Sequence, residues 1–187
     1  MGEPMESKSL TTIKPPSSQS TQAGQYLTFA LNGETYAIGI LNVKEIIDFG
    51  DLTEVPMMPS FIKGVINLRG RVVPVIDLTA RFGHGVTQIA KRTSVIIVEI
   101  DDTAAGENGE MLQNIGIMVD AVNEVVDIAQ DEIEPPPSFG TRIRADFISG
   151  MAKRNSKFMI LLAADQVLSI EEMVNIGHPP HTNGVLG

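Results

Sequence analysis

The sequence predicts an all-β fold made of two similar small β-barrels, and three observations predict it. Short β-rich runs recur along the chain, most of them bounded by Gly, Pro, Asn or Asp, whereas helical patterns are few. The dipeptide Asn32-Gly33 joins two of these runs in the manner of a tight hairpin. Several segments of the first half of the chain also return, in the same order, in the second half.

The predicted strands cover most of the chain between residues 25 and 162. The first two, 25–31 and 34–40, flank Asn32-Gly33, a pair that tolerates positive φ at both central positions of an antiparallel turn. The other runs are bounded by turn residues and are rich in side chains that favour strands. They span residues 43–47, 64–68, 71–77, 93–100, 111–118, 122–128, 147–152 and 157–162.

One short helix and three irregular segments complete the predicted organisation. Residues 165–175 place apolar side chains near one helical face before Gly177 ends the run, so we expect a helix that covers one barrel end. Residues 1–24 are rich in Ser, Thr, Gln and Pro, which predicts a flexible tail, and residues 176–187 form a second one. The acidic, glycine-bearing residues 99–110 predict a solvated hairpin loop.

An internal repeat divides the predicted domain, which spans residues 25–175. VKEIID at residues 43–48 matches VNEVVD at 122–127, and each lies downstream of an Ile-Gly-Ile triplet. FIKG at 61–64 matches FISG at 147–150. This period is far longer than that of a solenoid repeat, so it predicts two barrels. We place the first at 25–90, with the helix 165–175, and the second at 91–164.

The two copies differ directly after the shared F-I-x-G pattern. The first copy continues into Asn67-Leu68-Arg69-Gly70, whereas the corresponding part of the second reads Lys153-Arg154-Asn155-Ser156. A fold needs only the pattern that both copies share. The NLRG segment, interpreted as an insertion, is therefore a candidate for partner recognition.

Charge and composition exclude several kinds of partner. The 187 residues contain 14 Lys+Arg and 23 Asp+Glu, a formal net charge of −9, so nucleic acid and anionic membrane surfaces would repel most of the protein. The absence of cysteine excludes disulfides and thiolate metal sites and suits a reducing cytoplasm. No stretch approaches the roughly 18 apolar residues of a membrane span, so we expect no direct membrane insertion.

The sequence contains no recognisable catalytic or metal-binding motif. It lacks G-x-S-x-G, Walker A, H-E-x-x-H and a complete G-x-G-x-x-G, and the acidic residues around Asp101 and Asp102 do not keep calcium-loop spacing. Asp77 and Asp120, at predicted strand ends, are interpreted as turn formers because no base or nucleophile accompanies them. We therefore predict a binding module that is not an enzyme, with no catalytic residue, metal or cofactor.

The chain resembles the CheW family of bacterial chemotaxis coupling proteins over about residues 25–175. The most specific part of the resemblance is the pattern GVxNLRGxxxPxxDL. The likeness extends over Tyr36-Ala37-Ile38, Val43-Lys44-Glu45-Ile46, Pro56, Pro59, Gly64-Val65-Ile66-Asn67-Leu68-Arg69-Gly70, Val73-Pro74, Ile76-Asp77-Leu78 and Val119-Asp120. It implies two five-stranded, SH3-like barrels, in agreement with the repeat. One departure is Ala163-Ala164-Asp165, where the family more typically ends the last strand in leucine-aspartate.

The resemblance also implies a function. CheW-like proteins are adaptors that bind the cytoplasmic tip of methyl-accepting chemoreceptors and the CheW-like regulatory domain of the histidine kinase CheA. The protein is then expected in the cytoplasm, recruited to membrane receptor arrays. A CheW paralogue in a non-flagellar chemosensory pathway is an alternative. A small β-barrel hydrolase or ligand carrier is another, and it would require a deep polar pocket with shifted titratable groups.

The resemblance further implies which residues meet the partners. In the family the receptor tip lies against a groove between the barrels, which implies receptor contacts at Val43, Glu45, Asn67, Leu68 and Arg69. Kinase contacts are expected at Gly64 and Gly70, where a missing side chain permits close approach, although a turn explains each glycine equally well. A Glu45–Arg69 ion pair that only stabilises the first barrel is the alternative for those two side chains.

Overall fold

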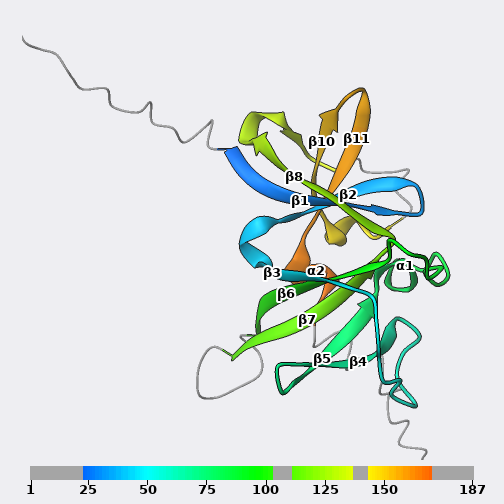
Figure 1. The fold of residues 1–187 in the computed structure, drawn as a ribbon. Helices are drawn as coiled ribbons and strands as arrows, with labels where there is room; N and C mark the ends of the chain where they lie inside the picture. The colour runs from blue at the N-terminus through cyan, green and yellow to red at the C-terminus, as the bar shows by residue number, and fades with distance from the viewer. Residues whose placement is uncertain (1–22, 103–110, 137–142, 170–187) are drawn as a thin grey trace, which may run out of the picture.

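A computed structural model describes residues 23–102, 111–136 and 143–169 (Figure 1), and these residues form an almost entirely β structure. All ten predicted strands are present, with ends that differ by no more than two residues. The all-β prediction is therefore confirmed. The strands are β1 (Ala23–Leu31), β2 (Glu34–Gly39), β3 (Val43–Asp48), β4 (Ile62–Leu68), β5 (Arg71–Asp77), β6 (Ser94–Asp102), β7 (Met111–Val119), β8 (Ala121–Ala129), β9 (Ile133–Glu134), β10 (Ile148–Arg154) and β11 (Lys157–Leu162).

The helices are short. They are α1 (Leu78–Arg81), α2 (Ala164–Val167) and the 3-10 helices η1 (Ile40–Asn42), η2 (Gln130–Glu132) and η3 (Ala145–Phe147). The prediction of a short C-terminal helix is confirmed by α2, whereas α1 and the two-residue β9 were not predicted. The part of the predicted helix beyond residue 169, the tail 176–187, residues 1–22 of the N-terminal tail and residues 103–110 of the predicted loop lie outside the described residues. The prediction is wrong for residues 23–24 of the tail, which belong to β1, and for residues 99–102 of the loop, which belong to β6.

Two sheets repeat the same strand order. The six-stranded sheet runs β8-β1-β2-β11-β10-β9 and the five-stranded sheet runs β3-β6-β7-β5-β4. In each, the third and fourth strands pair in parallel, β2 with β11 and β5 with β7, and the other neighbours are antiparallel. The VKEIID and VNEVVD segments, β3 and β8, occupy matching sheet edges. The sequence repeat is therefore also a repeat of structure.

Neither sheet is made of one continuous part of the chain, as the predicted barrels at 25–90 and 91–164 would require. The hairpin β1–β2 lies in the six-stranded sheet with β8 to β11, and the hairpin β6–β7 lies in the five-stranded sheet with β3, β4 and β5. Each sheet thus takes one hairpin from one repeat and its remaining strands from the other, four in the six-stranded sheet and three in the five-stranded sheet. The physical reason is the three-residue η1, which carries the chain from β2 in one sheet to β3 in the other.

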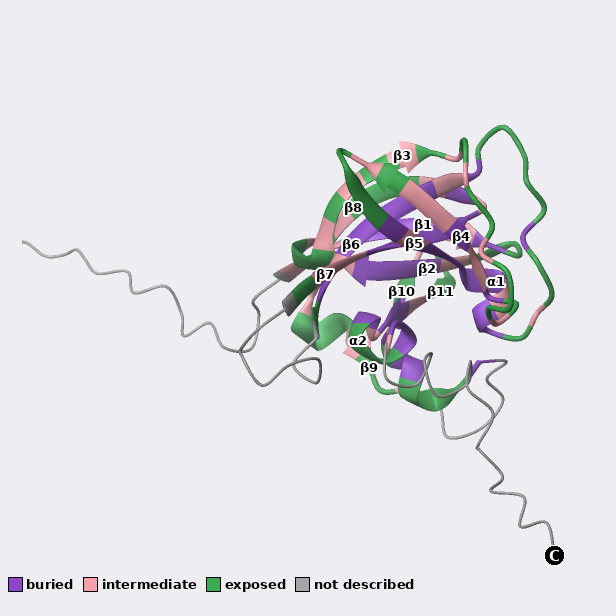
Figure 2. Cartoon of the chain, turned by 90° about the horizontal axis from the view of Figure 1, so that it is seen from below, coloured by how far each residue is buried: buried purple, intermediate pink, exposed green. Residues whose placement is uncertain are grey.

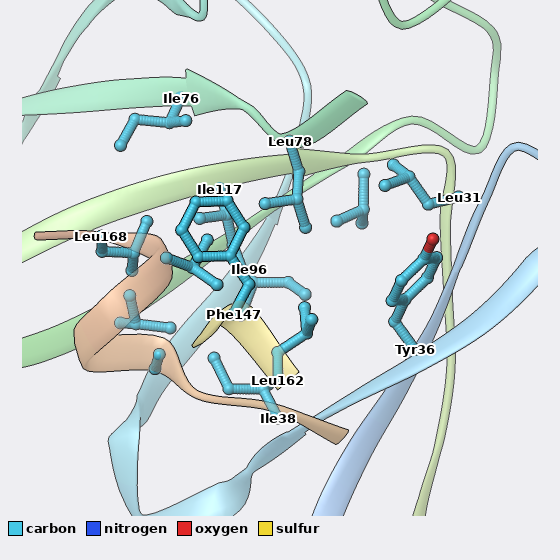
Figure 3. Close-up of a cluster of buried hydrophobic side chains, with 14 of the residues drawn as sticks. Leu31, Tyr36, Ile38, Ile76, Leu78, Ile96, Ile117, Phe147, Leu162 and Leu168 are labelled. Atoms are coloured by element: carbon cyan, nitrogen blue, oxygen red, sulfur yellow. The ribbon is translucent and has the colours of Figure 1, made fainter. Parts of the chain in front are cut away.

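Three hydrophobic clusters form the core. The largest fills the space between the sheets, and each sheet also curls around a smaller cluster of its own. Along β6, Ile96 and Val98 point into the large cluster, whereas Val95 and Ile97 point into the small one, so the strand is buried on both faces. Figure 3 shows the large cluster, and Figure 2 shows the buried strands in purple inside an exposed rim.

A buried arginine joins the two repeats. The Nε of Arg81 in α1 donates a hydrogen bond to the carbonyl oxygen of Val167 at 2.9 Å. Its guanidinium carbon lies 5.1 Å from the ring centre of Phe61 and 4.7 Å from that of Phe147. These two phenylalanines are the matched first residues of FIKG and FISG. Arg81 therefore holds equivalent points of the two repeats against each other.

The two aspartates that were interpreted as turn formers have that role. Asp77 is 1% exposed, caps α1 by accepting from the amides of Thr79 and Ala80, and accepts from both the amide and the hydroxyl of Thr87. Asp120 accepts from the Asn32 amide at 2.8 Å, where the β1–β2 turn begins.

Candidate partner-binding site

The NLRG segment forms the tip of the β4–β5 hairpin. Leu68 pairs with Arg71, so Arg69 and Gly70 make a two-residue turn with φ of 54° and 84°. The side-chain oxygen of Asn67 accepts from the Gly70 amide at 2.9 Å and closes the turn. In the second repeat, Asn155 and Ser156 form a turn of the same length and hand. NLRG is therefore no insertion, and side-chain chemistry alone distinguishes the two tips.

Arg69 occupies a position that its own backbone disfavours. A positive φ costs about 1–2 kcal/mol for most residues, and Asn or Gly is usual at this place in such a turn. The matched position in the second repeat holds Asn155, as this preference predicts. Residues held in left-handed backbone often belong to functional sites, so the observation points to a role for the guanidinium.

A bulge in β3 brings Glu45 to Arg69. Val43 pairs with Val98 and Glu45 with Ile97, so Lys44 is an extra residue in the ladder and re-aims its neighbours. The Nη1 of Arg69 lies 3.2 Å from one carboxylate oxygen of Glu45, and Nη2 donates to the other oxygen at 3.2 Å. Because β3 and β4 are the two edges of the five-stranded sheet, this pair bridges its open seam.

The pair is asymmetric in exposure. The Arg69 side chain is 79% exposed and the Glu45 side chain 26%. An ion pair with so much solvent access stabilises a fold by only about 0–1 kcal/mol. The intramolecular pair that was considered as an alternative is therefore present, yet its contribution does not exceed the cost of the Arg69 backbone. Most of the guanidinium still faces solvent.

The other residues that were expected to contact the receptor lie in different surroundings from one another. Val43 is half-buried against the cluster between the sheets, whereas Leu68 packs against the cluster inside the five-stranded sheet. The Asn67 side chain is occupied in holding the turn. Glu45 and Arg69 are thus in direct contact, Asn67 and Leu68 adjoin them in sequence, and Val43 begins the same strand as Glu45.

The largest hydrophobic cluster fills the interior between the sheets, and the expected surface groove between the barrels stays a prediction. A cavity of about 150 Å³ lies within the five-stranded sheet, beside Asn67 and Leu68. Its other lining residues are Ile47, Asp48, Phe49, Gly50, Asp51, Leu52, Ile66 and Val95. Sequence reasoning missed residues 48–52, although Phe49 and Leu52 continue the apolar spacing of β3 past its end.

The two glycines have different surroundings. A Cβ added to Gly64 would lie 2.3 Å from both the Leu52 side chain and the Thr53 carbonyl oxygen. Gly150, its match in the second repeat, is equally crowded, since a Cβ there would lie 2.5 Å from Ile133. The need for Gly64 is therefore internal and common to both repeats. Gly70 is exposed, with nothing within 4 Å of an added Cβ.

The described residues offer no other chemistry at this site. Within residues 23–102, 111–136 and 143–169, no three His, Cys, Asp or Glu side chains are grouped to hold a metal ion. Nor is any helix in these ranges of the length and apolarity that crossing a bilayer requires. The turn, the ion pair and the small cavity are the features that a partner would meet.

Comparison with known proteins identifies the family. Residues 25–172 match the family described as the CheW-like domain. The chain belongs to the CheW-like family. Chemotaxis protein CheW of Klebsiella aerogenes is 33% identical over 153 residues, 82% of this chain and 86% of the relative. That of Bacillus subtilis is 32% identical over 145 residues, 78% of this chain and 86% of the relative.

A solved structure shares the fold as well. The crystal structure of scaffolding protein TtCheW from Thermoanaerobacter tengcongensis is 40% identical to this chain, with a TM-score of 0.65. The match covers 75% of this chain and 89% of TtCheW. This CheW-like protein therefore has the two-subdomain β fold of the family, and the family is one of non-catalytic chemotaxis scaffolds.

Proposed function

We propose that this CheW-like protein couples transmembrane chemoreceptors to the histidine kinase CheA in chemotaxis arrays. The observation that carries the proposal is the state of Arg69. Its backbone has an unfavourable positive φ, its side chain is exposed at a hairpin tip, and its guanidinium is oriented by Glu45. An orienting partner reduces the side-chain entropy that binding would otherwise cost. Arg69 is thus prepared to meet a carboxylate.

The receptor contact follows from what surrounds the pair. The planar guanidinium binds a carboxylate in bidentate fashion, and 79% of the Arg69 side chain is open to solvent beside Glu45. Leu68 supplies an apolar surface next to it, and Val43 lies on the same strand as Glu45. A receptor helix with an acidic residue and an apolar face would match this arrangement. We assign the receptor contact to Val43, Glu45, Asn67, Leu68 and Arg69.

The kinase contact is proposed on the exposed side of the same hairpin. Gly70 leaves the backbone of the turn open, so another domain can approach it closely. Gly64 lies beneath Leu52 and Thr53, so its contribution is to hold β4 against residues 52–53, of which Leu52 lines the cavity. CheA would then meet the tip while Gly64 shapes the surface behind it.

The test separates recognition from folding at Arg69. Replacing it by asparagine (R69N) removes the guanidinium and suits the left-handed backbone, so we expect an unchanged or slightly higher Tm. Binding to a purified receptor signalling fragment should weaken about tenfold. Binding is measured by calorimetry, and CheA phosphorylation in the ternary mixture gives a second readout. R71N, which removes the neighbouring exposed arginine, is the matched control and should bind within about twofold of wild type.

A charge exchange distinguishes the two roles of the pair. The double variant E45R/R69E keeps an ion pair across the seam while reversing its polarity. If the ion pair is only structural, the double variant should bind the receptor fragment normally. If Arg69 recognises the receptor, as proposed, the double variant should bind the fragment as weakly as R69N does. Normal receptor binding by both R69N and E45R/R69E would refute the proposed site.

A further inference from the structure

We infer that the β10–β11 hairpin tip is a second docking surface, which binds an acidic segment of a partner protein carrying one apolar side chain. This surface lies on the six-stranded sheet, whereas the β4–β5 tip lies on the five-stranded sheet, and the two hairpins are at opposite ends of the molecule (Figure 1). The inference is independent of the receptor site, and both surfaces can be occupied at once.

The tip concentrates positive charge on an acidic protein. Lys153, Arg154 and Lys157 fall within five residues, and β10 and β11 contain no Asp or Glu, although the chain carries a net charge of −9. Lys153 and Lys157 are exposed, and none of the three cations is ion-paired with a carboxylate of the described residues. Arg154 instead donates to the carbonyl oxygen of Asp127, which anchors the tip to β8. The two lysines are therefore available to a partner.

An exposed aromatic side chain accompanies the charges. Phe158 is 54% exposed and is the direct cross-strand partner of Lys153, so both side chains leave the hairpin on the same face. Aromatic side chains are the commonest anchors of protein interfaces because they bury a large area at a low entropic cost. Phe158 and Lys153 together form an apolar and cationic contact point.

A cavity opens beside the tip. It has a volume of about 240 Å³ and lies between β8 and the β10–β11 hairpin, with Val126 and Met159 as apolar walls and Arg154 and Lys157 among its polar lining. Its position corresponds to the Glu45–Arg69 seam of the other sheet, because Glu124 matches Glu45 and Asn155 matches Arg69. Asn155 has no guanidinium that could pair with Glu124, and the hydrogen bond from Arg154 to the Asp127 carbonyl oxygen bridges this second seam instead. The cavity, which Glu124 also lines, is open to a side chain from outside.

Charge decides the class of the partner. A membrane or nucleic acid presents an extended array of phosphates, which the net charge of −9 opposes over most of the surface. A short protein segment needs only the local field of the tip. Two or three carboxylates around one apolar residue would pair with Lys153 and Lys157 while the apolar side chain enters the cavity or packs on Phe158.

The experiment uses the full chain and a fluorescent peptide in which glutamates flank a single leucine. Fluorescence anisotropy should show saturable binding that weakens with added salt, and peptides with glutamine for glutamate, or serine for leucine, should bind less tightly. The K153E/K157E variant should weaken binding at least about tenfold. Its matched control is K91E/R92E, which changes the net charge equally at two exposed residues before β6 and should remain within about twofold.

The apolar contact has a matched control in the other repeat. Val72 occupies the position that matches Phe158 and is 72% exposed. F158S should weaken peptide binding about five- to tenfold, whereas V72S should not change it. R69N, which tests the receptor site, should bind the peptide as wild type does, so failure of one site is distinguishable from failure of the other.

Three outcomes would overturn the inference. They are no saturable binding of the acidic peptide, equal losses in K153E/K157E and K91E/R92E, and peptide binding that is indifferent to F158S. Binding to lipid vesicles tests the alternative that the surface recognises a membrane. If vesicles of phosphatidylglycerol and phosphatidylcholine bind the chain through Lys153 and Lys157 while the peptide does not, the surface recognises lipid and the inference is wrong.

Discussion

At the scale of single residues, the structure separates charged side chains that build the fold from those that face partners. Asp77 is buried, and both of its carboxylate oxygens accept hydrogen bonds, from α1 and from Thr87. Its counterpart in the second repeat is Ala163, and α2 has no side-chain cap. The family resemblance singled out this departure, and here it marks a missing cap. Arg69, in contrast, is exposed and contributes little to stability.

Replacing Asp77 by alanine should destabilise the protein markedly. The change leaves the amides of Thr79, Ala80 and Thr87 without their acceptor in a buried place, which should lower the free energy of unfolding by about 2–3 kcal/mol. Urea unfolding followed by circular dichroism measures the effect. D120A, which removes one exposed acceptor from the Asn32 amide, should cost no more than about 1 kcal/mol. Equal losses in the two variants would contradict the assigned role of Asp77.

At the scale of elements, matching irregularities appear in both repeats. The β4 and β10 ladders shift register at the same place, between Ile62 and Gly64 and between Ile148 and Gly150. Both glycines lie where another segment crosses closely, and that close approach explains why F-I-x-G recurs in the sequence. The hairpin tips, where the repeats diverge, have the same length and turn geometry. The shared F-I-x-G glycines therefore serve packing, whereas the exposed hairpin tips differ in side-chain chemistry.

Substituting alanine for Gly64 tests this division. The new Cβ would overlap the Thr53 carbonyl oxygen, and we expect a loss of about 2–3 kcal/mol, measured by thermal and urea unfolding. Gly70 has a positive φ and open space, so G70A should cost only about 1 kcal/mol, from its backbone alone. If G70A proves as destabilising as G64A, crowding is not the reason for the glycine at position 64.

At the scale of the whole molecule, the repeats are interlocked. Each sheet is completed by a hairpin from the other repeat, the largest cluster lies between the sheets, and Arg81 spans equivalent positions of both. Neither repeat keeps its own hairpin beside its own remaining strands. The molecule should therefore fold and unfold as one cooperative unit.

Cutting the chain between the repeats tests the interlocking. Residues 1–90 contain β1 to β5 and residues 91–187 contain β6 to β11, so each fragment has strands of both sheets and a complete version of neither. We expect neither fragment alone to show a cooperative thermal transition, and the two mixed together to recover one. The near-ultraviolet circular dichroism and calorimetry of each sample provide the measurement. A fragment that melts cooperatively by itself would favour the division at residue 90.

Much of the candidate site was predictable from sequence. NLRG was singled out because its residues differ from those at the matched place in the second repeat. The Glu45–Arg69 ion pair was anticipated as the alternative to the receptor contacts that the family resemblance implies for these two residues. The cavity at residues 47–52 was not, since it depends on how residues 52–53 fold back onto β4.

The amino-acid sequence by itself determined the strands, the turns and the family. These follow from local causes: the alternation of apolar residues, the preference of Asn32-Gly33 for positive φ, and a motif read along the chain. Only the tertiary structure decided which strands pair and which surfaces stay open. The repeat makes the two hairpins nearly equivalent partners for the remaining strands of either sheet, and the short η1 linker, together with burial of the inter-sheet cluster, selects the exchanged arrangement.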